Sequence, residues 1–292
     1  MISYSIKDLE KITGIKAHTI RIWEKRYGIV EPSRTNTNIR FYSDKDLRHL
    51  MNVAILNKYG YKISNLQSMT EAEINNCILE LTNQDIDNDY QVDSLIMAMI
   101  ELDEPRFEKI VASSILKDGF SYTFENLLHR FLEKVGILWQ IGTIVPAQEH
   151  FIIQLIRRKL ILAIDGQEKH LDKGKTFLLF LPENEFHELA LLYLHFLIRK
   201  AGHKAIYLGQ NVPLQNIKNV FDIHHVDYLL TSVISFINEE PMLALINELN
   251  QLYSDRKILL GGNFQHFESL IFPENFILFR TLPEFAKFLS EQ

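Results

Sequence analysis

The C-terminal part of the chain alternates short apolar runs with amphipathic helical patterns, and this alternation restricts the possible folds more than any other feature. Strands that alternate with helices pair in parallel, because each helix carries the chain back along the sheet. The pattern therefore predicts a doubly wound, Rossmann-like α/β domain over residues 174–292. Its five predicted strands are Thr176–Leu181, Ala205–Leu208, Tyr228–Val233, Lys257–Leu260 and Phe276–Phe279.

Several polar or glycine residues fall at the carboxyl ends of these strands. Ligands of doubly wound sheets bind outside those ends, so residues placed there are candidates for a binding site. Glu185 and His187 follow the first strand, and Ser232 lies near the end of the third. Gly261 and Gly262 close the fourth strand, where the absence of a side chain allows a close approach to the backbone.

The region before this domain is helical in character. Apolar stripes such as Leu128, Phe131 and Val135 recur at helical spacing, which predicts a bundle of four or five helices over residues 73–168. The polar segment 165–169 is expected to link this bundle to the α/β domain.

The first sixty residues have the pattern of a helix-turn-helix unit. Ser5 with Asp8 predicts a capping box that opens a first helix, and Gly14 suits the turn after it. A second helix is expected over residues 17–26, where Trp23 lies on an apolar face. Bases on another face make this helix a candidate recognition helix for the major groove of DNA. These bases are His18, Arg21 and Lys25.

After Pro32 the pattern changes to a period of two. Ile39 and Phe41 alternate with Arg40 and Tyr42, as expected for a short ribbon with one buried face. The loop over residues 34–38 suits the tip of a wing that lies over a phosphate backbone.

Charge is unevenly distributed along the 292 residues. Residues 1–60 carry eleven Lys and Arg against six Asp and Glu, whereas the whole chain carries 31 against 37. The remainder therefore holds 20 bases against 31 acids, and nucleic-acid binding is expected to be confined to the basic head.

Composition argues against several other classes of protein. No apolar run reaches the ~18–20 residues of a membrane span, and residues 1–8 do not have the apolar core of a signal peptide. The single cysteine, Cys77, leaves no internal disulfide, and no Cys/His cluster has zinc-site spacing. We therefore expect a cytoplasmic, globular protein that does not bind a membrane.

The head resembles the winged helix-turn-helix domain of MerR-family transcription regulators over residues 1–72. The resemblance rests on Arg-x-Trp-Glu-x-Arg-Tyr-Gly at 21–28, Pro-Ser-Arg at 32–34 and Arg-x-Tyr-Ser-Asp at 40–44. It implies that the head binds double-stranded operator DNA. MerR proteins usually dimerise through a long coiled coil, but no heptad run here is long enough, so a dimer or tetramer must assemble differently. The DNA contacts that it implies are Thr19, Arg21 and Arg26 in the helix, and Arg34, Arg40 and Tyr42 in the wing. His18 and Lys25 are added to the expected contacts because they lie on the basic face of the helix.

The strand-end residues resemble the Asp-x-His-x-x-Gly, Ser-x-Leu/Val and Gly-Gly motifs of cobalamin-binding domains. The resemblance implies that His187 binds the cobalt of adenosylcobalamin in place of the cofactor's own base. Glu185 and Ser232 would be its supporting groups, since a metal-binding imidazole needs a partner that fixes its tautomer. Gly261 and Gly262 would border the slot for the displaced nucleotide tail.

The helical segment resembles the cap of cobalamin-dependent MerR regulators of the photoreceptor repressor type. Nine residues separate Trp139 from the pair Glu149-His150. By this resemblance Trp139 packs against the adenosyl group, while Glu149 and His150 line its pocket.

Two positions depart from these family patterns. Ala190 stands where cobalamin-binding domains have Gly, and overpacking by such a methyl group costs ~1–3 kcal/mol, or roughly ten- to a hundredfold in affinity. Gln140 stands where light-sensing members often carry a second histidine ligand.

Three functions are consistent with these observations to different degrees. The leading one is a repressor whose oligomerisation and operator binding depend on adenosylcobalamin and respond to light. The alternative is a MerR-type regulator with a degenerate, cofactor-free effector domain, controlled by a protein partner or by oligomerisation alone. An enzyme is not expected, because the chain has no room for a separate catalytic barrel of ~250 residues.

Overall fold

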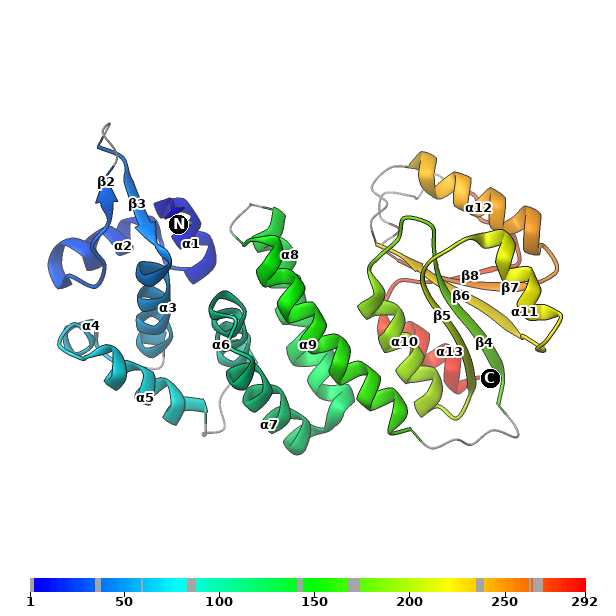
Figure 1. Ribbon diagram of the computed structural model, residues 1–292, viewed down its shortest axis with the longest axis horizontal. Helices are drawn as coiled ribbons and strands as arrows, with labels where there is room; N and C mark the ends of the chain where they lie inside the picture. Colours follow the sequence, from blue (N-terminus) through cyan, green and yellow to red (C-terminus); the bar gives the residue numbers. More distant parts are fainter. Residues whose placement is uncertain are drawn as a thin grey trace. The chain divides into compact units, whose positions relative to one another are not determined.

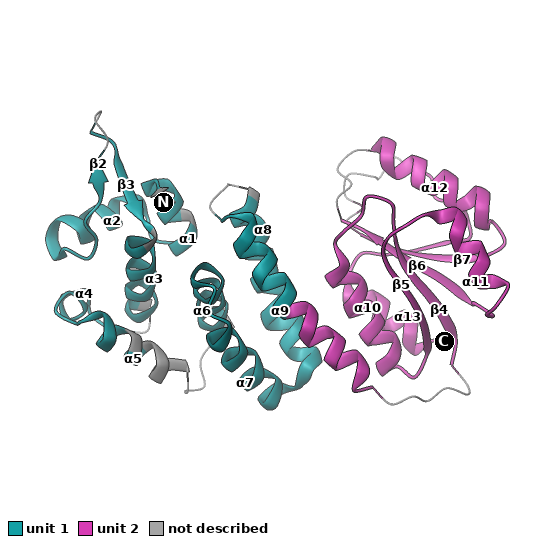
Figure 2. Cartoon of the chain, in the orientation of Figure 1, with its two compact units in different colours: residues 1–155 teal, residues 156–292 magenta. Residues whose placement is uncertain are grey.

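The chain divides within helix α9 (Pro146–Asp165) into two units, residues 1–155 and residues 156–292 (Figure 2). The computed structural model describes residues 3–34, 38–58, 60–82, 88–140, 144–167, 174–234, 239–262, 264 and 270–292. The domain limits expected at residues 72, 168 and 174 divide the chain more finely than these units, and they stay predictions.

The first unit begins with a helix-turn-helix and a small antiparallel sheet, labelled in Figure 1. Its elements are β1 (Ser3–Tyr4), α1 (Ile6–Thr13), α2 (Ala17–Ile22), a π-helical turn (Trp23–Tyr27), β2 (Ser33–Arg34), β3 (Arg40–Ser43) and α3 (Asp44–Lys58). The predicted capping box is present, because Ser5 and Asp8 each accept the backbone N–H of the other. Gly14 ends α1 with a φ of 73°, a left-handed conformation that glycine adopts without strain. In the sheet, β3 lies between β1 and β2.

The helix expected over residues 17–26 is divided in the structure. α2 ends at Ile22, and the chain continues as the wider π-helical turn, which ends at Gly28 with a φ of 64°. Ile20 and Trp23 are buried, as their spacing predicts. The same apolar spacing is compatible with an α-helix and with this wider turn, so the sequence pattern did not distinguish them.

In the ribbon, the buried face is the one that carries Tyr42. Tyr42 is fully buried, whereas Ile39 is 63% exposed. The expected wing tip falls partly on residues 35–37, which lie outside the described residues. Beside them, the Arg34 guanidinium donates to the side-chain oxygen of Asn38 at 2.8 Å.

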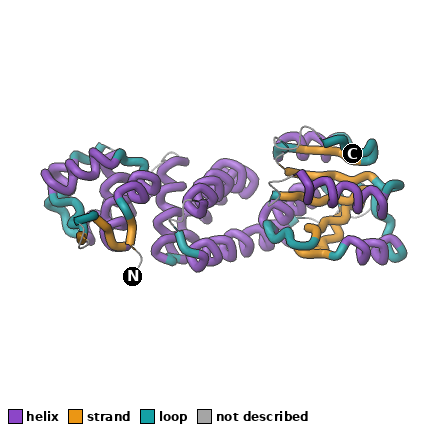
Figure 3. The backbone as a smooth tube through the Cα atoms, turned by 90° about the horizontal axis from the view of Figure 1, so that it is seen from above, coloured by secondary structure: helices purple, strands orange, loops and turns teal. Residues whose placement is uncertain are grey.

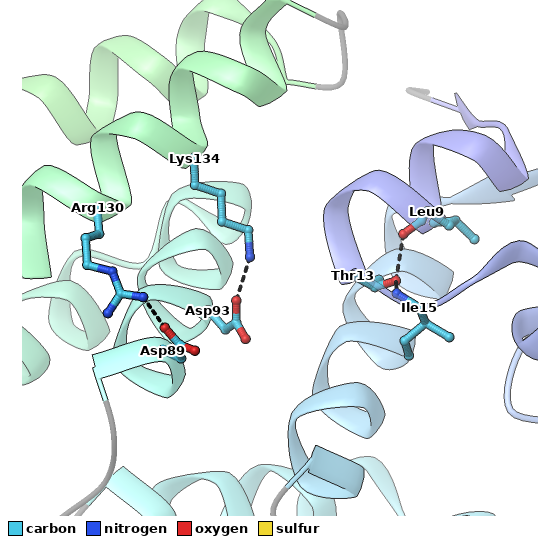
Figure 4. Close-up of polar contacts among 7 residues, drawn as sticks. All are labelled: Leu9, Thr13, Ile15, Asp89, Asp93, Arg130 and Lys134. Atoms are coloured by element: carbon cyan, nitrogen blue, oxygen red, sulfur yellow. Dashed lines mark hydrogen bonds and ion pairs between the residues drawn. The ribbon is translucent and has the colours of Figure 1, made fainter.

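Helices make up the rest of the first unit, as the helical pattern predicts. They are α4 (Ile63–Leu66), α5 (Glu71–Thr82), α6 (Asn88–Glu101), α7 (Glu104–Thr123), a π-helical turn (Phe124–Leu128), α8 (His129–Gln140) and the first part of α9. Two ion pairs join α6 to α8, Asp93 with Lys134 at 2.6 Å and Asp89 with Arg130 (Figure 4). A search of the described helices finds none with the length and apolar content needed to cross a membrane.

The second unit is a five-stranded parallel sheet with helices on both sides (Figure 3). The strands are β4 (Thr176–Pro182), β5 (Lys204–Val212), β6 (Tyr228–Val233), β7 (Lys257–Gly262) and β8 (Phe276–Phe279), in the order β5-β4-β6-β7-β8. The helices are α10 (Glu188–Lys200), a 3-10 turn (Leu214–Ile217), α11 (Lys218–Phe221), α12 (Glu239–Tyr253) and α13 (Leu282–Ser290). The predicted doubly wound fold is confirmed. Ligands of such sheets bind where the strand order reverses, which here is at the carboxyl end of β4.

Asp227 fastens the beginning of β4 to the segment before β6. Its carboxylate accepts the backbone N–H of Thr176 at 2.8 Å and the ammonium group of Lys175 at 3.1 Å. Burial alone would raise the pKa of Asp227, but the Thr176 N–H and the Lys175 ammonium outweigh it and hold the pKa below its usual range. The ionised carboxylate therefore stabilises the fold of the second unit.

Replacing Asp227 with Asn should lower the opening free energy of β4 by about 1–2 kcal/mol at neutral pH, because a neutral amide does not form the ion pair with Lys175. The opening free energy of β4 amides, measured by hydrogen exchange, checks this change. Asp222→Asn, at an exposed position, is the matched control.

The same substitution gives a pH dependence with a defined sign. Because the folded pKa lies below the unfolded value of about 3.9, the stabilisation is present above that value and is lost as pH falls through the folded pKa. The difference in the opening free energy of β4 between wild type and Asp227→Asn should therefore become smaller in acid. A difference that is independent of pH would contradict the role of the charge.

Candidate functional site

The loop after β4 is organised around the fully buried carboxylate of Glu185. Its Oε1 accepts the backbone N–H groups of Phe186 and His187 at 2.9 and 3.0 Å, and its Oε2 accepts that of Ile234 at 2.9 Å. A buried charge requires such donors, because no water replaces them. The carboxylate thus joins the end of β4 to the end of β6.

The imidazole of His187 is held by the same carboxylate. Its Nδ1 lies 2.5 Å from Oε1 of Glu185, and its side chain is 55% exposed. A carboxylate at Nδ1 favours the tautomer that carries the hydrogen there and leaves the lone pair on Nε2. The structure therefore brings together two predicted site residues in an arrangement suited to metal ligation by Nε2.

Ser232, near the end of β6, has a buried hydroxyl without a hydrogen-bond partner among the described residues. Leaving a buried hydroxyl unpaired costs about 1–3 kcal/mol, so a polar atom of a ligand fits this position. Thr231 also has an unpaired buried hydroxyl. Successive strand residues point to opposite faces of the sheet, so the two hydroxyls do not share one site.

The glycine pair at the end of β7 is required by packing within the sheet. A Cβ atom at Gly261 would lie 2.4 Å from the ring of Phe279, and one at Gly262 would lie 2.8 Å from the carbonyl oxygen of Val233. Gly261 is also the register partner of Ser232 across β6 and β7. The pair therefore lies beside the unpaired hydroxyl, although its own neighbours already explain the absence of side chains.

Ala190, the departure from the family pattern, lies half-buried in the first turn of α10. Its methyl group follows His187 by three residues and so stands on the same short segment as the imidazole.

A second carboxylate, Glu188, connects three elements next to His187. It accepts Nε of Arg157 from α9 at 2.7 Å and the hydroxyl of Tyr207 from β5 at 3.0 Å. Burial, and then the charge of Glu188, raises the pKa of Tyr207, which keeps the phenol a donor. This network was not predicted from the sequence, because its partners are 31 and 19 residues from Glu188 and no local pattern couples them.

In the first unit, the cap residues lie at the end of α8 and the beginning of α9. Trp139 is 45% exposed, Glu149 is half-buried and His150 is exposed. Trp139 is therefore not a core aromatic. Gln148, which was also not predicted, is buried and fixes the start of α9 by donating to the Ile100 carbonyl at 3.1 Å.

The head presents most of its predicted DNA contacts to solvent. Thr19 is half-buried, and the guanidinium of Arg26 lies over the ring of Tyr27 at 5.4 Å. The exposed members of the set are His18, Arg21, Lys25, Arg26 and Arg34.

Of the two wing residues in β3, Tyr42 lies where it was not expected, whereas Arg40 keeps part of its side chain exposed. Tyr42 is fully buried, and its hydroxyl donates to Glu24 at 3.4 Å, so the expectation that it contacts DNA is wrong. Burial first, and then the charge of Glu24, raises the pKa of Tyr42 to about 12. Arg40 pairs with the same carboxylate through Nε, at 3.1 Å from each oxygen.

Comparison with known proteins identifies two regions of the chain. Residues 4–73 match the family of MerR HTH regulatory proteins. Residues 91–163 match the B12 binding domain family. The second match covers the helical segment with Trp139, Glu149 and His150, rather than the sheet that carries His187.

Two relatives resemble most of the chain. The HTH-type transcriptional repressor CarH of Myxococcus xanthus is 26% identical over 259 residues, which are 85% of this chain and 85% of CarH. The HTH-type transcriptional repressor CarA of the same organism is 23% identical over 88% of this chain and 85% of CarA.

Among solved structures, the monomethylamine corrinoid protein of Methanosarcina barkeri shares the fold. It has a TM-score of 0.56 at 16% identity, covering 70% of this chain and 100% of that protein. Residues 4–73 therefore belong to the MerR family of helix-turn-helix regulatory proteins, and residues 91–163 belong to the B12-binding domain family.

Proposed function

We propose that this chain is a transcription regulator that represses by binding double-stranded operator DNA and that responds to adenosylcobalamin. The observation that carries the proposal is the half-exposed imidazole of His187, oriented by a buried carboxylate, in a chain whose head is a MerR-type domain. Both Myxococcus xanthus relatives are named as transcriptional repressors, which supports a regulator rather than an enzyme.

The DNA-binding half of the proposal is supported by charge and exposure. The exposed bases of the second helix would read the major groove, and Arg34 in the wing would contact phosphate. Thr19 would lie at the same helix surface, where a hydroxyl can donate to phosphate or to a base edge.

The residues of the second unit suit a cobalamin. His187 would bind the cobalt through Nε2, and Glu185 would hold the ring and its tautomer. Ser232 would pair its unsatisfied hydroxyl with the displaced nucleotide tail, beside Gly261 and Gly262. When bound, adenosylcobalamin supplies a cobalt–carbon bond that light can break.

The cap residues of the first unit would suit an adenosyl group. Trp139 exposes a large aromatic surface, and aromatic faces stack well on a purine. Glu149 and His150 offer polar groups at the beginning of α9 that would line the adenosyl pocket.

Control of DNA binding would act through self-association. A ligand shifts an equilibrium only by its differential affinity for the two states, so the cofactor must favour the homo-oligomer, a dimer or tetramer, that engages the operator. We expect this to occur in the cytoplasm. Because Gln140 replaces the second histidine of light-sensing members, a light-induced state with two histidine ligands is not part of the proposal.

Replacing His187 with Ala should abolish or strongly weaken retention of the cofactor. Purified protein mixed with adenosylcobalamin in the dark and gel-filtered should elute with a corrinoid spectrum, and His187→Ala should not. His224→Ala removes an exposed histidine and is the matched control. A wild-type protein that elutes without corrinoid yet binds DNA would instead indicate the cofactor-free regulator.

Replacing Ser232 with Ala should leave the stability of the cofactor-free protein unchanged or slightly increased, because the lost hydroxyl has no protein partner. Affinity for adenosylcobalamin should fall by up to about tenfold, the equivalent of one hydrogen bond. Thr231→Val removes the other unpaired hydroxyl on the opposite face and should leave affinity unchanged. Thermal unfolding and titration calorimetry measure the two effects. Equal losses of affinity in both variants would argue against a specific role for Ser232.

Light should disperse the DNA-binding oligomer. Size-exclusion chromatography with light scattering should give a larger species with adenosylcobalamin in the dark than after illumination. Hydroxocobalamin serves as the control, because it lacks the adenosyl group. It should not support the dark oligomer. An oligomeric state that is the same in all three samples would contradict cofactor control.

A further inference from the structure

An acidic residue lies at the centre of the basic head. Glu24, in the π-helical turn, is 15% exposed at its side chain, and both of its oxygens lie 3.1 Å from Nε of Arg40 in β3. The hydroxyl of Tyr42 donates to one of the same oxygens. The carboxylate thus joins the end of the predicted recognition helix to the strand that leads from the wing.

This contact uses only the inner nitrogen of Arg40. The Arg40 side chain is 34% exposed, and its terminal nitrogens have no hydrogen-bond partner among the described residues. A guanidinium is planar and its donors point in fixed directions, so fixing Nε also fixes the direction of the two terminal nitrogens. Arg40 is therefore held in one orientation with its outer donors available to an anion.

Resting on the proposed function, we propose that Glu24 is a positioning residue for DNA binding. It holds Arg40 by Nε so that the terminal nitrogens bind a DNA phosphate, and Tyr42 completes the contact from the buried side. Arg40 is then a phosphate contact as expected, but one whose geometry depends on an acid that does not itself touch DNA.

Removal of the Glu24 carboxylate should change the affinity for DNA in the direction opposite to that expected from the loss of a negative charge. A carboxylate near DNA repels phosphate, so removing an acid without a positioning role should tighten binding. Removing Glu24 should weaken binding instead, because Arg40 loses its fixed orientation. Charge alone cannot give this result.

The test is binding of the full-length protein to a fluorescently labelled random-sequence DNA duplex, measured by anisotropy between about 50 and 200 mM salt. Glu24→Ala should weaken binding roughly tenfold, the value of a charge-assisted hydrogen bond. The slope of log affinity against log salt should fall by about 0.9, as for the loss of one phosphate contact. Glu24→Gln should recover part of the affinity, because its amide oxygen still accepts Nε. Glu31→Ala, at an exposed acid of the same head, should bind as tightly as wild type or more tightly.

A double-mutant cycle separates positioning from folding. In an Arg40→Gln background, Glu24→Ala should cause no further loss of affinity, because the group that it positions is already absent. An equal loss with and without Arg40 would overturn the proposal and indicate a general effect on the fold. Unchanged or tighter binding by Glu24→Ala, with the full salt slope, would overturn it as well.

The outcome for wild type distinguishes this inference from the proposed function. If wild type shows no salt-dependent binding to the duplex, the proposed DNA-binding function fails, and the inference fails with it. If wild type binds and Glu24→Ala binds equally, only the inference fails.

Discussion

The buried carboxylate of Glu185 is the constraint on which the candidate cofactor site depends. It occupies the point where β4 ends, and it accepts hydrogen bonds from the loop of His187 and from the end of β6. A charge in such a position is stable only with its donors in place, so the carboxylate and the loop determine each other's conformation. The orientation of the imidazole follows from this mutual requirement rather than from packing of the ring.

The same principle operates at the other end of the chain. Glu24 holds Arg40 by its inner nitrogen, as Glu185 holds His187 by Nδ1. In both pairs an acid with little exposed surface engages one nitrogen of a basic side chain. The difference lies in what the nitrogen-bearing group offers: a lone pair at His187 and hydrogen-bond donors at Arg40. The two ends of the molecule therefore use similar positioning for opposite chemistry.

Much of this architecture was predictable from the sequence, because apolar runs and caps are local signals. β6 and β8 have the predicted bounds, and the capping box of α1 is present. The pairing of Glu185 with His187 was predicted correctly because only one residue separates them in the sequence. Contacts between distant residues were not predictable. Glu24 and Arg40 are 16 residues apart, and Glu188 and Arg157 are 31 apart, with no periodic pattern to connect them.

The wing shows where local reasoning was wrong for a physical reason. Alternation identifies two faces of a strand, but it does not say which face is buried when each carries an aromatic ring. Tyr42 could be buried because the carboxylate of Glu24 satisfies its hydroxyl, a partner that strand periodicity does not reveal. The DNA contact expected of Tyr42 therefore became an internal one.

The two units also differ in when they can fold on the growing chain. The first unit is mostly helical, whereas in the second unit β4 pairs with β5 on one side and with β6 on the other. Leu178 of β4 can pair with Leu229 of β6 only after the intervening residues have been synthesised. Helices with local contacts form faster than sheets closed by distant segments, and synthesis proceeds from the N-terminus. The head is thus complete while the ribosome is still making the strands around His187. Translation that stopped within the second unit would therefore leave the first unit without the strands that surround His187.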